Sequence, residues 1–299
     1  METNQREELL TKLQKIVDTK CPGIGSFESS VPDLRYARRS NEKNEIVHCF
    51  YDSCIALVLQ CSKEVTVGSI KLAYGRGSMI LVTVDMPSSY RIITDDENSN
   101  FLALSLHLDL NLIAQLSSKM PVDNSEIEPL AFKVEEANDE ILGCLLRLVN
   151  CDDDPLKAKI LADPIKQELY FHLLRGPFGL RLRNIFGRES YGKNMIHMVE
   201  FLKKHYKENF SIDELAAKAN MASPTFFKHF KKFTSISPLQ YQKYLRLHEA
   251  RRLMLVEDYN ASNAAFEVGY ESQQQFNREY KRLFGLPPKE HINELKKEL

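Results

Sequence analysis

The feature that most constrains the fold of this chain is a helical pattern that occurs twice near its carboxyl end. In the first copy, residues 211–214 read Ser-Ile-Asp-Glu, which is the spacing of a capping box, and the helical segment ELAAKAN follows. A turn over residues 220–222 then leads to Ser223, the expected N-cap, and to Pro224 at the first helical position of PTFFKHFKKFT. Aromatic residues recur there at helical spacing and predict one buried face: Phe226, Phe230 and Phe233.

The second copy repeats this arrangement. Residues 260–270 predict a short helix that ends in a glycine turn at Gly269, and Ser272 then caps the helical segment QQQFNREYKRLFG. Its expected inner stripe consists of four apolar side chains: Phe276, Tyr280, Leu283 and Phe284. We therefore predict two helix-turn-helix units, which together span residues 192–288.

Both units suit the recognition of double-stranded DNA, because a helix that buries aromatic rings and exposes polar groups can enter a major groove. The second helix begins with amides and a guanidinium that can bind adenine and guanine edges: Gln273, Gln274, Asn277 and Arg278. Between the units, the helical run 239–255 would extend about 25 Å, a suitable spacer for grooves about 34 Å apart. Its expected apolar positions are Leu239, Tyr244, Leu247, Ala250 and Leu253. These features predict sequence-specific binding to a long asymmetric site.

The charges are distributed unevenly along the chain. From Arg188 onward there are 19 Lys/Arg against 14 Asp/Glu, about +5, which leaves 21 against 27, about −6, for residues 1–187. Only the carboxy-terminal part is therefore suited to a polyanion, although a charge of this size is also common in proteins that bind no nucleic acid.

The part before the repeat has a different pattern. After an amphipathic helix over residues 2–18, short apolar or alternating runs predict strands of a small barrel or sandwich: 54–60, 64–74, 78–85, 90–94 and 101–110. Helical spacing then predicts an annex of helices at 111–119, 138–150 and 155–176, with Pro164 bending or dividing the last one. The glycine- and arginine-rich stretch 176–192 lacks clean periodicity and predicts the domain junction.

Two long segments resemble the signature of AraC/XylS-type transcription regulators: SPLQYQKYLRLHEARRLM and AAFEVGYESQQQFNREYKRLFGLPP. The stretches 51–68 and 175–185 are similar to the amino-terminal effector domain of one subgroup, whose barrel resembles the cupin fold. The resemblance implies an α+β chain: a cupin-like effector and dimerisation domain over 1–180, and a double helix-turn-helix DNA-binding domain over 188–299. Such a chain would be a bacterial activator or repressor that binds promoter DNA under control of a small effector, whose identity and contact residues stay unassigned.

The resemblance also implies recognition helices at 223–233 and 272–283. Base contacts then fall on Pro224, Thr225, Phe227, Lys228, Gln273, Gln274, Asn277 and Arg278. Phosphate contacts are expected at Ser223, Lys231, Lys232, Ser272, Lys281 and Arg282, although the four basic side chains would fit a solvated face equally well. Two departures stand out: Phe227 replaces a residue that is usually polar, and Cys54 and Cys61 replace an expected Pro and Gly.

Other chemistry is not expected from the sequence. The six cysteines lack a zinc spacing and are predicted to be reduced, mostly buried thiols. The barrel region offers only His48 and His107, far apart in sequence, so neither a catalytic metal nor a cofactor is predicted. Without a secretory or membrane-spanning pattern, we expect a cytoplasmic protein with no membrane partner.

Two alternatives and two further partners remain at this stage. One alternative is a cupin-like small-molecule binding protein or enzyme whose DNA-binding domain is an accessory. The other is an interaction adaptor that has lost DNA binding, which the intact set Gln273, Gln274 and Arg278 disfavours. A homodimer formed through the helical annex and a contact with RNA polymerase are the further candidate partnerships.

Overall fold

A computed structural model describes residues 2–40, 46–94, 99–121, 130–186 and 191–297. The chain divides into two compact units, one formed by Met1–Val47 and Tyr51–Lys193 and the other by His48–Phe50 and Asn194–Leu299. We call them the sheet unit and the helical unit. The predicted fold class, a sheet-rich amino-terminal part followed by an all-helical carboxy-terminal part, is confirmed.

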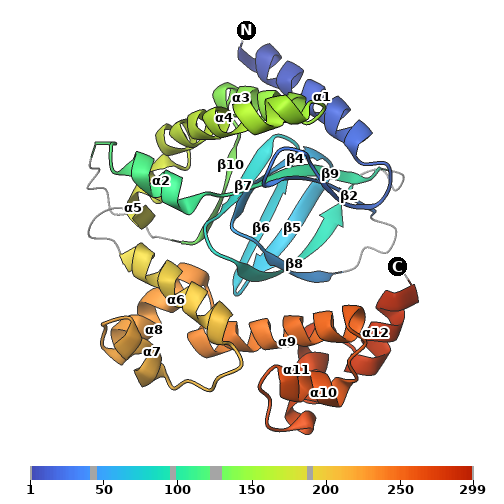
Figure 1. Ribbon diagram of the computed structural model, residues 1–299, viewed down its shortest axis with the longest axis vertical. Helices are drawn as coiled ribbons and strands as arrows, with labels where there is room; N and C mark the ends of the chain where they lie inside the picture. Colours follow the sequence, from blue (N-terminus) through green and yellow to red (C-terminus); the bar gives the residue numbers. More distant parts are fainter. Residues whose placement is uncertain (1, 41–45, 95–98, 122–129, 187–190, 298–299) are drawn as a thin grey trace. The chain divides into compact units, whose positions relative to one another are not determined.

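The sheet unit contains two antiparallel sheets. The six-stranded sheet has the order β1-β2-β9-β4-β7-β10, and the four-stranded sheet has the order β3-β8-β5-β6 (Figure 1). The strands are β1 (Gly25–Glu28), β2 (Leu34–Arg39), β3 (Val47–Tyr51), β4 (Cys54–Gln60), β5 (Ser62–Val67), β6 (Ile70–Gly75), β7 (Ser78–Val82), β8 (Met86–Ile93), β9 (Phe101–His107) and β10 (Phe132–Glu136). Strands β4, β7 and β9 are almost wholly buried and supply much of the core.

Two predicted strand runs differ from the structure. The run 64–74 is a hairpin rather than one strand, because Gly68, with φ 58°, turns the chain between β5 and β6. The run 101–110 stops at His107, because Asp109 accepts a hydrogen bond from the Leu112 amide (2.9 Å) and starts a helix. Leu110, expected on the strand face, is therefore the first residue of that helix.

Five helices belong to the sheet unit: α1 (Glu2–Lys20), α2 (Leu110–Ser117), α3 (Asp139–Asn150), α4 (Pro155–Arg175) and α5 (Gly179–Phe186). Of the two effects predicted at Pro164, division of the helix is wrong, since α4 continues through it as one helix. Pro164 and Ile160 are both exposed, so water can hydrate the Ile160 carbonyl that the proline leaves without a donor. Helix α5 likewise occupies part of the stretch expected to be an irregular junction, because it buries an apolar face that includes Leu182 and Ile185.

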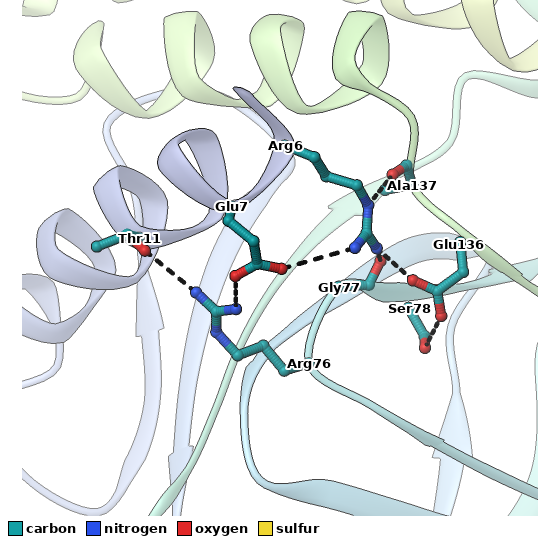
Figure 2. A network of polar contacts seen from close by, with 8 residues as sticks. All are labelled: Arg6, Glu7, Thr11, Arg76, Gly77, Ser78, Glu136 and Ala137. Carbon is teal, nitrogen blue, oxygen red and sulfur yellow. Dashed lines mark hydrogen bonds and ion pairs between the residues drawn. The ribbon is translucent and has the colours of Figure 1, made fainter. Parts of the chain in front are cut away.

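A polar network fastens α1 to the sheets, as Figure 2 shows. The Arg6 guanidinium donates to the carbonyl oxygens of Ala137 and Gly77, both at 3.0 Å, and forms an ion pair with Glu136. Next to it, Arg76, which lies in the turn between β6 and β7, forms an ion pair with Glu7 of α1. These contacts join three segments that are distant in sequence.

The helical unit consists of α6 (Tyr191–His205), α7 (Ile212–Lys218), α8 (Ser223–Thr234), α9 (Pro238–Val256), α10 (Ala261–Glu267), α11 (Gln273–Phe284) and α12 (Pro288–Lys297). Helices α7 and α8 pack together near one end of α9, and α10, α11 and α12 pack around its other end (Figure 1). None of the helices described is both long and apolar enough to cross a membrane.

Candidate nucleic-acid interface

The two predicted helix-turn-helix units correspond to α7–α8 and α10–α11. Ser211 forms the predicted capping box at α7: its hydroxyl accepts from the Glu214 amide (3.2 Å), and the Glu214 carboxylate accepts from the Ser211 amide (2.7 Å). Asn260 caps α10 by accepting from the Asn263 amide at 2.8 Å. Both units thus begin with a short helix whose start is fixed by a side chain.

The two units also share their backbone turns. The turn between the helices contains Asn220 (φ 52°) in the first unit and Gly269 (φ 90°) in the second. The second helices end at Ser235 (φ 65°) and Gly285 (φ 84°), both with positive φ. The repeat is therefore present in the chain path as well as in the sequence.

One capping prediction is wrong and its counterpart is confirmed. Ser223 is the first residue of α8, not its N-cap, which is Ala222; the Ser223 hydroxyl instead hydrogen-bonds to the Asp213 carboxylate. Ser272 is the N-cap of α11 and accepts from the Gln275 amide at 3.4 Å. The difference arises because α7 places an acidic acceptor beside Ser223.

The predicted contact residues of the first unit lie on the surface of α8. Phe226, Phe230 and Phe233 are fully buried, as the spacing predicted. The other face is exposed at Pro224, Thr225, Phe227, Lys228 and Lys231, whereas Ser223 and Lys232 are half-buried. Helix α8 contains no acidic residue, so its exposed face is wholly basic or neutral.

In the second unit, the exposed predicted residues are Ser272, Gln273, Gln274, Arg278, Lys281 and Arg282. Asn277 differs from the rest. It is half-buried, and its Oδ1 atom is buried without a hydrogen-bond partner among the described residues. This rotamer does not present the amide oxygen that would accept from adenine.

The exposed faces of α8 and α11 correspond position by position. Counted from the N-caps Ala222 and Ser272, the second, fifth, sixth and ninth residues form one stripe on each helix. These residues are Pro224, Phe227, Lys228 and Lys231 on α8, and Gln274, Asn277, Arg278 and Lys281 on α11. The two helices thus offer equivalent faces with different side chains.

Arg246, on α9, connects the two units and was not singled out by the sequence analysis. Its Nε donates to the Tyr206 carbonyl at 2.6 Å, and its Nη1 donates to the Gly269 carbonyl at 3.0 Å. Its Nη2 donates to three further oxygens, on Lys207 (3.1 Å), Glu208 (2.8 Å) and Asn209 (3.0 Å). One guanidinium therefore joins the segment before the first unit to the turn of the second.

The segment 206–209 makes further contacts with the second unit. Lys207 forms an ion pair with Glu267, and the Asn209 amide donates to Glu271 at 2.8 Å. Gly269 fits directly against this segment, since a Cβ atom there would lie 2.2 Å from the Lys207 carbonyl oxygen. The segment that precedes the first unit is thus fastened to the second unit, in addition to the connection of the two units through α9.

Glu279, the acidic residue of α11, interacts with other residues of the helical unit. Glu279 accepts from the Tyr270 hydroxyl at 2.7 Å and pairs with Lys243 at 2.9 Å. Burial disfavours its charged form, but these hydrogen bonds outweigh burial and hold the pKa of Glu279 below its usual value. Its negative charge is therefore partnered within the protein.

The linker helix α9 has a different buried face from the predicted one. Leu247, Ala250 and Leu253 are buried as expected, but Leu239 is 44% exposed and Tyr241 is buried instead. The capping box of Ser237 and Gln240 starts α9 one residue before Leu239, which places that leucine on the outer side of the first turn.

Comparison with known proteins gives matches over both units. A family model described as the AraC-type transcriptional regulator N-terminus matches residues 30–181, and a helix-turn-helix domain model matches residues 215–294. The HTH-type transcriptional activator RhaS of Escherichia fergusonii is 28% identical over 104 residues, which cover 35% of this chain and 37% of RhaS. The probable transcriptional regulator LumQ of Photobacterium leiognathi is 30% identical over 95 residues, covering 32% of this chain and 38% of LumQ. The chain thus spans well under half the length of these relatives.

Among solved structures, unsaturated fatty acid bound wild-type ToxT from Vibrio cholerae matches 89% of this chain and 96% of its own, with a TM-score of 0.57. The sequence identity is 12%, so this likeness concerns the fold alone.

Proposed function

Because the chain belongs to the AraC family of transcription regulators, we propose that it is a sequence-specific DNA-binding regulator whose recognition helices are α8 and α11. Residues 188–299 bind promoter DNA, and residues 1–180 receive a small effector. The observation that carries this proposal is the pair of equivalent faces on α8 and α11. Both helices belong to one helical unit, in which Arg246 joins the segment before α7 to the turn before α11. Two reading surfaces in fixed register are what a site of two successive major grooves requires.

The side chains divide into base and phosphate contacts. Arg278 and Gln274 are exposed on α11 and suit guanine and adenine edges. On α8, Thr225 and Lys228 are exposed, and Phe227, 38% exposed, suits a thymine methyl group. The remaining basic residues, Lys231, Lys232, Lys281 and Arg282, lie later on the two helices and suit phosphates. Asn277 joins the base contacts only after its side chain rotates.

The test begins with fragments of genomic DNA selected by the full-length protein. Replacing Arg278 by Ala should weaken binding to the selected site by about 1–3 kcal/mol and relax the preference at one base pair, while binding to random DNA changes little. The matched control is Arg252→Ala, because Arg252 is an exposed arginine of the same unit that pairs with Glu249 and Glu257. Equal losses on selected and random DNA for Arg278→Ala would contradict the base-contact role.

We further propose that the effector carries an anionic group on an apolar body. Lys63, on β5, is only 9% exposed, and its ammonium lies 3.6 Å from the Tyr90 ring centroid and 5.0 Å from that of Tyr51. A buried ammonium bordered by aromatic rings combines charge attraction with apolar contact. The fold shared with a protein that holds an unsaturated fatty acid supports the same class of effector.

Oleate and its methyl ester provide a matched pair of probes for this class. Oleate should raise the melting temperature of the wild-type protein, and the uncharged ester should not. The Lys63→Met variant should lose the response to oleate. A response to the ester equal to that of oleate would exclude recognition through the charge.

The chain also has a surface suited to a second copy of itself. Three large apolar side chains of α4 share one exposed face: Leu156 (64% exposed), Ile160 (58%) and Phe171 (38%). Lys157 and Lys159 precede Ile160 on α4 and Asp163 follows it, so an antiparallel pair of α4 helices centred on Ile160 brings opposite charges together. Ile160→Glu should weaken self-association about tenfold or more. A molar mass that stays monomeric as concentration rises would overturn this dimer.

A further inference from the structure

Helices α3 and α4 bring three different metal-binding side chains to one point. Cys144 comes from α3, and Glu168 and His172 lie one turn apart on the same face of α4. One ligand atom from each residue lies within 4.8 Å of the other two. The Cys144 side chain is buried, whereas the Glu168 side chain is 45% exposed and that of His172 is 23% exposed. The point is therefore accessible to an ion from solvent.

The same three side chains surround a positive charge in this structure. The Arg147 guanidinium lies 2.6 Å from a Glu168 carboxylate oxygen and 3.3 Å from the Cys144 sulfur. The His172 Nε2 atom lies 3.8 Å from the same carboxylate oxygen. Arg147 is 49% exposed and its side chain can rotate into solvent. The donor set thus favours a cation, and its present occupant is displaceable.

We propose that Cys144, Glu168 and His172 form a binding site for a thiophilic divalent cation of the Zn²⁺ type, which displaces Arg147. The Cys144 thiol releases its proton to solvent and binds as a thiolate. The Glu168 carboxylate and the neutral His172 Nε2 supply two further ligands, and water supplies the fourth. Zinc binds Cys, His and Glu side chains, and in open sites three protein ligands leave the fourth position to water.

The ligand distances agree with a small closure of the side chains. Tetrahedral zinc with bonds of about 2.0–2.3 Å holds its ligand atoms about 3.5 Å apart, so the donors must approach by roughly 1 Å. Departure of the guanidinium permits that movement. Sulfur and imidazole favour zinc over magnesium or calcium, which prefer oxygen ligands.

The site is not visible as a motif, because Cys144 is separated from the Glu168-x-x-x-His172 pair by most of two helices. It is also independent of DNA binding, since all of its residues belong to the sheet unit. Failure to bind Zn²⁺ would therefore leave the proposed DNA-binding function unaffected, and failure to bind DNA would leave the proposed metal site unaffected.

The test uses the full-length reduced protein, stripped with a chelator, and two probes. Zn²⁺ is titrated against a chromophoric chelator, and Co²⁺ is followed by its thiolate charge-transfer absorption, which reports a sulfur ligand directly. The wild type should bind one ion per chain with a thiolate signal. Absence of stoichiometric binding, or binding without the thiolate signal, would overturn the proposal.

Three variants make the assignment specific. Cys144→Ser should abolish the thiolate signal, and His172→Ala should weaken Zn²⁺ binding at least tenfold. Arg147→Met should tighten Zn²⁺ binding, because it removes the competing guanidinium. Since Arg147 is on the surface, this variant tests the site even if Cys144→Ser impairs folding. His205→Ala is the matched control: His205 lies 2.7 Å from Glu208 on an exposed helix end but has no thiol beside it among the residues described. If His205→Ala weakened Zn²⁺ binding as much as His172→Ala does, the ion would be bound adventitiously at surface residues and the proposal would be wrong.

Discussion

Arg246 shows how much one side chain contributes to the placement of the reading helices. Five oxygens surround one planar guanidinium, which donates from all three of its nitrogens, and lysine cannot reproduce that geometry. Arg246→Lys should lower the free energy of unfolding by about 2–3 kcal/mol, because several carbonyl groups lose their donor. Urea unfolding measures this, with Arg252→Lys as control, expected to change stability by less than about 0.5 kcal/mol. Equal losses in the two variants would refute the role assigned to Arg246.

Asp152 gives a pH-dependent prediction at the same scale. Burial opposes its charge, but hydrogen bonds from Ser29, Ser30 and Tyr36 outweigh burial and lower the pKa of Asp152 from 3.8 to about 2. Because the folded-state pKa is the lower one, its stabilisation, about 2 kcal/mol, is present above pH 4 and is lost as the pH falls toward 2. Asp152→Asn should therefore destabilise the protein at pH 6, and the difference from wild type should narrow by pH 3. A difference independent of pH would contradict this.

Individual residues were predictable from sequence to the extent that helical periodicity fixes a face. The buried Phe226 and Phe276 and the exposed Gln274 and Arg278 follow from spacing alone. The half-buried Asn277 lies at the edge of its stripe, where periodicity does not decide orientation. Arg246 could not be assigned a role, because its partners lie in segments that come together only in the folded unit.

At the scale of elements, two glycines in turns of the second unit allow the cost of a left-handed backbone to be compared with the cost of a steric clash. Gly285 has φ 84° and open space where a Cβ atom would lie, whereas Gly269 has φ 90° and a backbone oxygen in the way. Gly285→Ala should cost about 1–2 kcal/mol for the left-handed conformation, and Gly269→Ala clearly more. Ser235→Gly should stabilise by about 0.5–1 kcal/mol, since Ser235 has φ 65°. Thermal unfolding ranks the three variants, and equal costs at Gly269 and Gly285 would be the contrary result.

Elements with their own start and stop signals were the predictable ones. Helices α7, α9 and α10 each begin after a side chain that caps them, and their observed positions agree closely with the predicted ones. Four strands are not predicted: β1, β2, β3 and β10. Strands β1, β3 and β10 are short edge strands with mixed burial, and β2 contains three arginines among its six residues. The pairing of β1 with β2 and of β10 with β7 supplies the regularity that their own sequences lack.

At the scale of the whole helical unit, the contacts that hold its helices together have a consequence for the spacing of the DNA site. If α8 and α11 contact two half-sites, as proposed, their separation is set by their packing on α9 and by the contacts of Arg246 and Gly269 with the segment before α7, rather than by a flexible linker. Insertion of 5 or of 10 base pairs between the half-sites should reduce affinity about equally, to that of one half-site. Fluorescence anisotropy at fixed salt measures this. Recovery of tight binding with the 10-base-pair insertion would show that the two units move independently.

The unequal faces of α8 and α11 also have a consequence for the geometry of regulation. Two-fold symmetric dimers read palindromes, which look the same from either side. If Phe227 and Lys228 at one end and Gln274 and Arg278 at the other contact bases, as proposed, the unit would read a sequence with a direction. Reversing such a site within a promoter would turn the bound protein end for end, so orientation as well as distance from the start of transcription would determine the outcome.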